Sequence, residues 1–209
     1  MNELEKRLEA EPASGNWSKL RQTVVESADR SRLLELTYER HDSPFGSLLV
    51  VAGESGILRI ALAPEPEPEV LDDLARRISP RIGRTGREVT TEARRQLDRY
   101  FAGELRTFDL PLDWRLTRAF RREVLRQTAA IPYGATASYT EVATGAGNPR
   151  AVRAAGTALA TNPLPILVPC HRVLRSDGKV GAYLGGSEMK SALLAMEEKA
   201  SAESETAPA

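Results

Sequence analysis

The residues best suited to covalent chemistry lie next to one another in the C-terminal third of the chain. Cys170 is the single cysteine among 209 residues, and His171 and Arg172 follow it directly. Thiolate is the nucleophilic form of cysteine, and neighbouring cations or hydrogen-bond donors favour it. The run therefore predicts a nucleophilic site, although a lone cysteine is more often a small apolar residue of the core.

Direct contact between His171 and the Cys170 sulfur is not favoured by the predicted backbone. Residues 162–169 form a proline-bounded apolar run that predicts a buried strand, and successive side chains of a strand point to opposite faces. A bridging water or a sharp turn is then needed for His171 to act as a base. The other histidine, His41, lies in a predicted strand and is expected to be structural or exposed.

Composition excludes several classes of protein. One cysteine excludes an intramolecular disulfide and zinc sites with three or four thiolates, and two histidines disfavour a structural metal. No run approaches the roughly 18 apolar residues of a membrane span, and the acidic N-terminus does not resemble a secretory signal. We therefore expect a globular chain without a structural metal, in a reducing, cytoplasmic compartment and not at a membrane.

Charge is distributed unevenly along the chain. The 29 basic residues balance the 29 acidic ones, but residues 114–180 hold ten basic and three acidic side chains, a net charge of +7. Such a segment is typical of a surface that binds a polyanion, and it also fits an ordinary solvated helix face.

Two short helices are predicted within this basic segment. Ser138 and Glu141 form a capping box for a helix ending near residues 145–147. Asn148 and Pro149 then suit the start of a second helix that continues to Ala160. The pair predicts a helix-turn-helix, with an ordinary helical hairpin as the alternative.

The elements before this segment predict a small α+β domain. Apolar runs in residues 34–64, separated by glycine-containing turns, indicate three antiparallel strands. Apolar residues at helical spacing follow after residue 65, and a second helix is predicted from Thr91 to Phe101. We expect an N-terminal extension over 1–34, this domain over 35–113, a helical domain over 114–198 and a tail without order over 199–209.

Several of these motifs together resemble one known family. They are Ile131-Pro132-Tyr133-Gly134, Ser138-Tyr139, Glu141, Asn148 to Arg153, Asn162-Pro163, Pro169-Cys170-His171-Arg172-Val173, Gly181, Tyr183, Gly185-Gly186 and Lys190. Their combination and order are similar to the O6-alkylguanine-DNA alkyltransferases. The resemblance is specific over residues 117–198, weaker over 35–113 and absent over 1–34.

The resemblance implies a fold and an activity. The fold would be α+β, with a ribonuclease H-like antiparallel-sheet domain followed by a mostly helical domain. The activity would be DNA repair: irreversible transfer of an alkyl group from O6-alkylguanine, and from O4-alkylthymine, in double-stranded DNA to Cys170. Each molecule would act once, as a monomer and without a cofactor.

The resemblance also assigns roles to individual residues. His171 would activate the thiol of Cys170 through a water, Glu197 would orient His171, and Tyr139 would rotate the 3′ phosphate and donate to the purine. Asn162 would tie the helix-turn-helix to the active-site segment by hydrogen bonds. The DNA-binding residues would be Arg150, Ala151, Arg153 and Ala154, with Arg153 filling the stack left by the flipped base, and the base pocket would be lined by Pro165, Val173, Tyr183, Leu184 and Gly185.

Some positions depart from the family pattern. Leu184 stands where a small residue is common, which predicts a narrower range of bulky adducts, and Ala160 and Thr161 replace a frequent basic residue, which predicts weaker DNA binding. Arg172 stays outside the implied catalytic set and is expected to pair with a carboxylate of the N-terminal domain.

Two other classes of function remain open. One is a helix-turn-helix damage sensor with an unreactive cysteine, although the small side chains of the second helix suit major-groove readout poorly. The other is a cysteine hydrolase, which is disfavoured because no suitably remote histidine is present.

Overall fold

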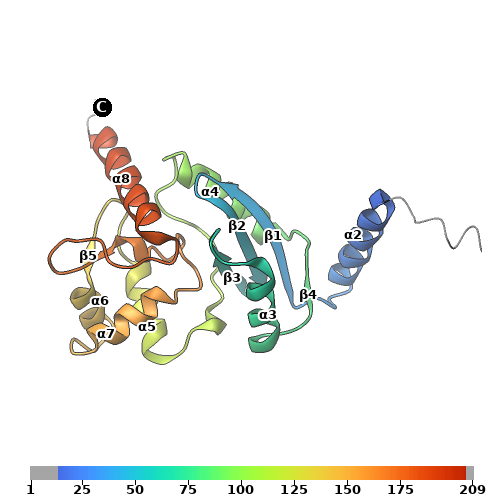
Figure 1. Cartoon of the computed structure of the whole chain (residues 1–209), viewed down its shortest axis with the longest axis horizontal. Coiled ribbons are helices and arrows are strands. Elements are labelled where there is room, and N and C mark those ends of the chain that lie inside the picture. Colours follow the sequence, from blue (N-terminus) through green and yellow to red (C-terminus); the bar gives the residue numbers. More distant parts are fainter. Residues whose placement is uncertain (1–13, 206–209) are drawn as a thin grey trace, which may run out of the picture.

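The computed structural model describes residues 14–205, and Figure 1 shows their arrangement. A sheet with its helices lies in the centre, the C-terminal helices lie on one side of it, and the N-terminal helix α2 (Ser14–Arg30) lies at the opposite end. The remaining parts of the predicted terminal segments, residues 1–13 and 206–209, lie outside the described residues.

The predicted three-stranded meander is confirmed. Strands β1 (Leu36–Ser43), β2 (Gly46–Gly53) and β3 (Gly56–Ala61) pair antiparallel in succession. The sheet is nevertheless mixed, because the short strand β4 (Ile82–Gly83) pairs parallel with β1. Two residues are too few to produce an alternating pattern, so the sequence did not predict β4.

Helices cover both faces of the sheet. Helix α3 (Glu67–Arg77) contributes Val70 and Leu74 to the core on one face. Helix α4 (Glu88–Phe101) packs on the other face, where Leu97 and Tyr100 are fully buried. Because β2 lies between two covered faces, nearly all of its side chains are apolar and buried.

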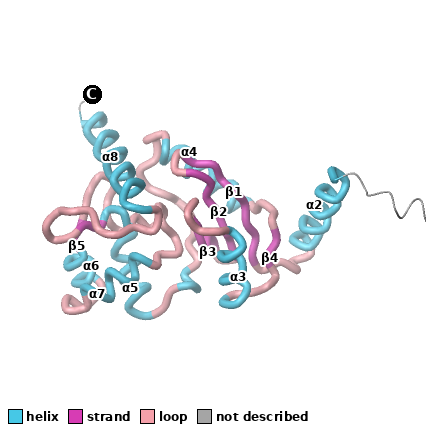
Figure 2. The backbone as a smooth tube through the Cα atoms, viewed as in Figure 1, coloured by secondary structure: helices cyan, strands magenta, loops and turns pink. Residues whose placement is uncertain are grey.

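The C-terminal part is mostly helical, as Figure 2 shows. Its core is continuous with the α4 face of the sheet, so the two parts of the chain share one set of buried contacts. No helix among residues 14–205 is both long enough and apolar enough to span a membrane. The elements are a 3-10 helix (Trp114–Leu116), α5 (Ala119–Ala129), β5 (Ala137–Ser138), α6 (Tyr139–Gly145), α7 (Val152–Ala160), a second 3-10 helix (Cys170–Arg172), β6 (Val173–Leu174) and α8 (Gly186–Glu205).

The predicted helix pair is present, with one change at its second helix. Ser138 and Glu141 form both bonds of the capping box of α6. Helix α7, however, begins at Val152 and not after Asn148. The Asn148 side chain accepts a hydrogen bond from the Arg150 backbone N–H, and this local turn takes up the residues expected to form the first helical turn.

Two further expectations are wrong. Residues 162–169 form turns and no strand: Ile166 has a positive φ of 73°, and the Val168 N–H bonds to the Leu164 carbonyl. Prolines at 163, 165 and 169 lack the N–H that a strand would need for pairing. The tail expected from residue 199 is helical to Glu205, because Ala and Glu favour continuation of α8.

Candidate active site

Cys170 is the first residue of a 3-10 helix and is only 5% exposed. This helix supplies the sharp turn that the sequence analysis required next to the cysteine. Burial raises the pKa of the Cys170 thiol to about 11, although the Asn162 amide and the charge of Lys190 favour the thiolate. The resting thiol is therefore protonated at neutral pH and needs a base for reaction.

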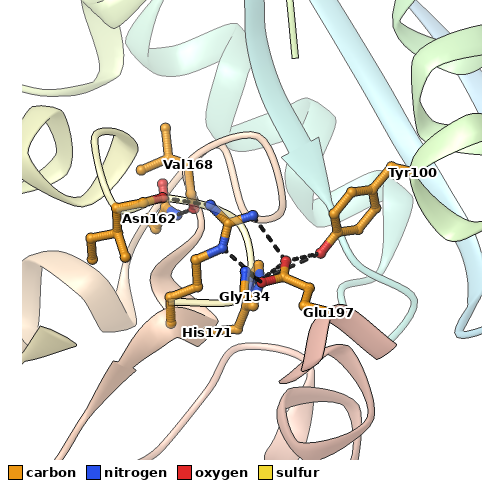
Figure 3. Close-up of polar contacts among 8 residues, drawn as sticks. Tyr100, Gly134, Asn162, Val168, His171 and Glu197 are labelled. Carbon is orange, nitrogen blue, oxygen red and sulfur yellow. Dashed lines mark hydrogen bonds and ion pairs between the residues drawn. The ribbon is translucent and has the colours of Figure 1, made fainter. Parts of the chain in front are cut away.

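Asn162 connects the end of α7 to the cysteine. Its Nδ2 donates to the Val168 carbonyl at 2.9 Å and lies 3.2 Å from the Cys170 sulfur, while its Oδ1 accepts from the Leu164 N–H at 3.0 Å. Figure 3 shows the amide facing Val168. The supporting position expected for Asn162 is therefore present in the structure, with a direct contact to the sulfur in addition.

His171 and Glu197 form a buried pair. His171 Nε2 lies 2.9 Å from Glu197 Oε1, and their residues are 0% and 1% exposed. Burial alone would raise the pKa of the Glu197 carboxyl, but hydrogen bonds from His171 and Arg172 lower it to about 2. Because the carboxylate is ionised, it places the imidazole proton on Nε2.

The other nitrogen of His171 is left with its lone pair. His171 Nδ1 is buried, and it has no hydrogen-bond partner among the described residues. Burial lowers the pKa of His171 below its ordinary value of 6.5, and Glu197 offsets this only in part. The ring is consequently neutral at pH 7, with Nδ1 able to accept a proton.

Glu197 receives more donors than the sequence analysis predicted. Arg172 binds both carboxylate oxygens at 2.9 Å, and the Gly134 N–H donates to Oε2 at 3.2 Å. The expectation that Arg172 pairs with the N-terminal domain is therefore wrong. The partner of Arg172 is Glu197 on α8, and the third guanidinium nitrogen, Nη1, donates to the Ile131 carbonyl at 2.6 Å.

Tyr100 was not identified from the sequence. Its hydroxyl donates to Glu197 Oε1 at 2.6 Å and lies 3.4 Å from His171 Nε2. Figure 3 shows the hydroxyl and the carboxylate facing each other. Tyr100 follows Ala93 and Leu97 at helical spacing, a signal that indicates core packing and does not reveal its polar contact.

Two tyrosines lie close to the cysteine. Tyr139 begins α6, and its hydroxyl would lie 2.6 Å from a Cβ added at Gly181, so the glycine permits this close approach. Burial, followed by the charge of Cys170, raises the pKa of Tyr139. The ring centroid of Tyr183 lies 6.3 Å from that of His171, edge to face.

The other residues expected to line the pocket are buried or partly buried. Val173 and Pro165 are buried, while Leu184 is partly buried and packs against the same core as Cys170. A Cβ at Gly185 would contact Met189 and Tyr183, which accounts for glycine there. Lys190 is fully buried and donates to the Val173 carbonyl at 2.6 Å, a contact the sequence analysis did not predict.

The first turn of α7 and the turn that precedes it carry two exposed arginines. Arg150, Arg153 and Ala154 are exposed and Ala151 is partly exposed, whereas Ala155 on the inner side is buried. Small residues next to exposed arginines allow a backbone to approach another surface closely. Among residues 17–202, no group of three or more His, Cys, Asp and Glu side chains could hold a metal ion.

Comparisons with family models decide the family. Residues 36–114 match the ribonuclease-like domain of 6-O-methylguanine DNA methyltransferase, and residues 119–199 match its DNA-binding domain. The chain belongs to the O6-methylguanine DNA methyltransferase family. Its activity is that of a methylated-DNA–protein-cysteine methyltransferase, which repairs O6-methylguanine.

Individual members of the O6-methylguanine DNA methyltransferase family agree with this assignment. The enzyme of Methanosarcina barkeri is 38% identical over 161 residues, which cover 77% of this chain and 96% of the relative. The constitutive enzyme of Bacillus subtilis is 37% identical over 77% of this chain and 94% of its own.

A solved structure confirms the α+β fold with its two parts. The O6-methylguanine methyltransferase of Mycobacterium tuberculosis superposes with a TM-score of 0.68 at 36% identity, covering 83% of this chain and 96% of that chain. Another structure holds the M. tuberculosis protein in complex with DNA, with a TM-score of 0.67 over 78% of this chain and 94% of that one.

Proposed function

We propose that Cys170 is the acceptor of the alkyl group and that His171 is the base that activates it. The thiol proton passes through a bridging water to His171 Nδ1. The sulfur then bonds the alkyl carbon while the bond between that carbon and guanine O6 breaks. The electron pair stays on the purine, which takes up one proton from solvent and leaves as guanine, while His171 releases the thiol proton to solvent.

The observation that carries this proposal is the orientation of the His171 ring. Glu197 holds Nε2 at 2.9 Å, which leaves Nδ1 buried and without a partner among the described residues. A ring fixed in this way keeps the accepting nitrogen available to a water between it and the neighbouring thiol. Tyr139, whose hydroxyl lies over Gly181, would donate to the leaving purine.

DNA is the partner, and we assign its binding to the outer face of α7. O6 of a paired guanine lies within the duplex, so the damaged nucleotide has to rotate out of the stack before it reaches a buried cysteine. Arg153 is exposed on α7 and would fill the space that the rotated nucleotide leaves in the DNA stack. Arg150, Ala151 and Ala154 would lie against the DNA backbone. O4-alkylthymine offers the same kind of alkylated oxygen and falls within the proposed substrates.

We further propose that the protein acts as a monomer and that each molecule acts once. A single chain supplies Cys170, His171, Glu197 and Tyr139, so no second copy is needed to complete the site. The thioether formed at Cys170 has no thiol proton to give up, and nothing in the proposed reaction restores it.

Mass spectrometry after incubation with duplex DNA containing one O6-methylguanine tests the assignment. Because the chain has one cysteine, a stoichiometric gain of one methyl group on the peptide containing Cys170 supports it directly. Cys170→Ala should transfer nothing and keep its affinity for the duplex. Lesion-selective binding by the unaltered protein without any methyl gain would instead identify a damage sensor with an unreactive cysteine.

A further inference from the structure

The ribonuclease-like part of the chain hydrogen-bonds the His171–Glu197 pair through one side chain, Tyr100. Tyr100 lies on α4, whereas His171 and Glu197 belong to the C-terminal part. Its hydroxyl donates to Glu197 Oε1 at 2.6 Å and lies 3.4 Å from His171 Nε2. Among the described residues between 36 and 114, only Tyr100 hydrogen-bonds Cys170, His171 or Glu197.

The Tyr100 ring is held firmly in place. It is 0% exposed, and aromatic neighbours surround it at centroid distances of 5.5 Å for Phe101, 5.2 Å for Phe108 and 6.1 Å for Tyr133. Burial raises the pKa of Tyr100 far above its usual range, so the hydroxyl keeps its proton at neutral pH and can donate it to Glu197. Packing thus fixes both the position and the protonation of this donor.

Glu197 Oε1 is the acceptor shared by three donors. It lies 2.9 Å from His171 Nε2, 2.9 Å from an Arg172 nitrogen and 2.6 Å from the Tyr100 hydroxyl. Each hydrogen bond to Oε1 partly neutralises the same negative charge. The bond from the Tyr100 hydroxyl therefore reduces how strongly the carboxylate can stabilise a protonated His171. The hydroxyl also fixes which direction Oε1 faces.

We propose that Tyr100 is a positioning residue that sets the orientation and the basicity of His171 by hydrogen-bonding Glu197. The ribonuclease-like domain thereby takes part in the transfer reaction through this one hydroxyl. The inference rests on the proposed roles of Cys170 and His171. The titratable groups around His171 are Tyr100 from α4, Cys170 and Arg172 from the 3-10 helix, Tyr183 from the loop before α8, and Lys190 and Glu197 from α8.

Tyr100→Phe removes the hydroxyl and keeps the ring that packs in the core. We expect the single-turnover rate of methyl transfer from duplex DNA at pH 7 to fall about tenfold, a part of what a general base contributes, because the lost orientation of Glu197 Oε1 and of the His171 ring outweighs the gain in basicity. The same substitution should have no further effect in a Glu197→Gln background, because Tyr100 acts through that carboxylate. Tyr38→Phe, the same change on β1 of the same domain, is the matched control and should leave the rate unaltered.

A second measurement does not depend on transfer. The chain has two histidines, so selective ¹⁵N labelling of histidine yields two rings, with His41 as the internal reference. In Tyr100→Phe the titration of His171 should move to higher pH, since more of the Glu197 charge is available to the imidazolium, and His41 should not move. An unmoved His171 titration together with an unaltered rate would overturn the role of Tyr100. Failure of the unaltered protein to transfer a methyl group would overturn the proposed function instead.

Discussion

At residue 171, the two nitrogens of one ring have different surroundings. Nε2 faces an ionised carboxylate at 2.9 Å, whereas Nδ1 has no partner among the described residues. In the proposed reaction this difference separates two tasks, because Nε2 fixes the ring while Nδ1 accepts the proton. A lowered pKa of His171 keeps the ring neutral for this work.

The pH dependence of transfer follows from the direction of that shift. Since the pKa of His171 lies below 6.5, we expect the transfer rate to be constant near neutral pH and to fall as pH drops through the lowered pKa. His171→Gln should lose this base, and its rate should then rise with pH toward about 11, the pKa of the Cys170 thiol. Quenched single-turnover assays across pH measure both profiles, and a flat profile for His171→Gln would contradict this assignment.

The sequence predicted part of this centre. Cys170 and His171 are adjacent in the chain, and the family resemblance extended the prediction to Glu197, which the structure places 2.9 Å from His171. Tyr100 was missed because its polar contact is 97 positions away in the chain and local spacing carries no sign of it. The partner of Arg172 was predicted wrongly for the same reason, since sequence does not show which of many carboxylates will lie nearby.

At the scale of elements, local chemistry decided which predictions succeeded. The capping box at Ser138 has both donors and acceptors within four residues, so α6 was predicted correctly. The run from 162 to 169 has the apolar composition of a strand, but its conformation depends on the Asn162 side chain and a positive φ at Ile166. Neither of these can be read from the apolar pattern.

Helix α7 carries a prediction of its own. Arg153→Ala should slow transfer from duplex DNA about tenfold or more, because rotating a base out of the stack costs a few kcal/mol that the arginine helps to offset. Reaction with the free base O6-benzylguanine should change little, since no stack has to be opened. Arg76→Ala, an exposed arginine on α3, is the control. Equal losses on both substrates would exclude a role for Arg153 in base flipping.

At the scale of the whole molecule, the site is assembled from both parts of the chain while α2 lies away from it. Tyr100 comes from α4 and Glu197 from α8, and the core that surrounds them is continuous. Helix α2 lies at the far end in Figure 1, where Asp29 pairs with Arg87 at 2.6 Å. The structure thus separates this helix from the chemistry.

Removal of residues 1–33 tests that separation. We expect the shortened chain to keep its transfer rate, because within the described region no residue of α2 hydrogen-bonds Cys170, His171 or Glu197. Its melting temperature should fall by about 2–4 °C, which corresponds to the loss of about 1 kcal/mol in a chain of this size. Calorimetry and the single-turnover assay measure the two quantities, and a large loss of rate would contradict the assignment.

The distance in sequence between the partners of His171 also matters while the protein is being made. Glu197 follows His171 by 26 positions, and ribosomes add residues at roughly 5–20 per second. For that interval the newly made cysteine exists without the carboxylate that orients its base. In the proposed mechanism, an unfinished chain therefore carries an unactivated thiol, and a chain whose translation stops before residue 197 lacks the carboxylate that would orient His171.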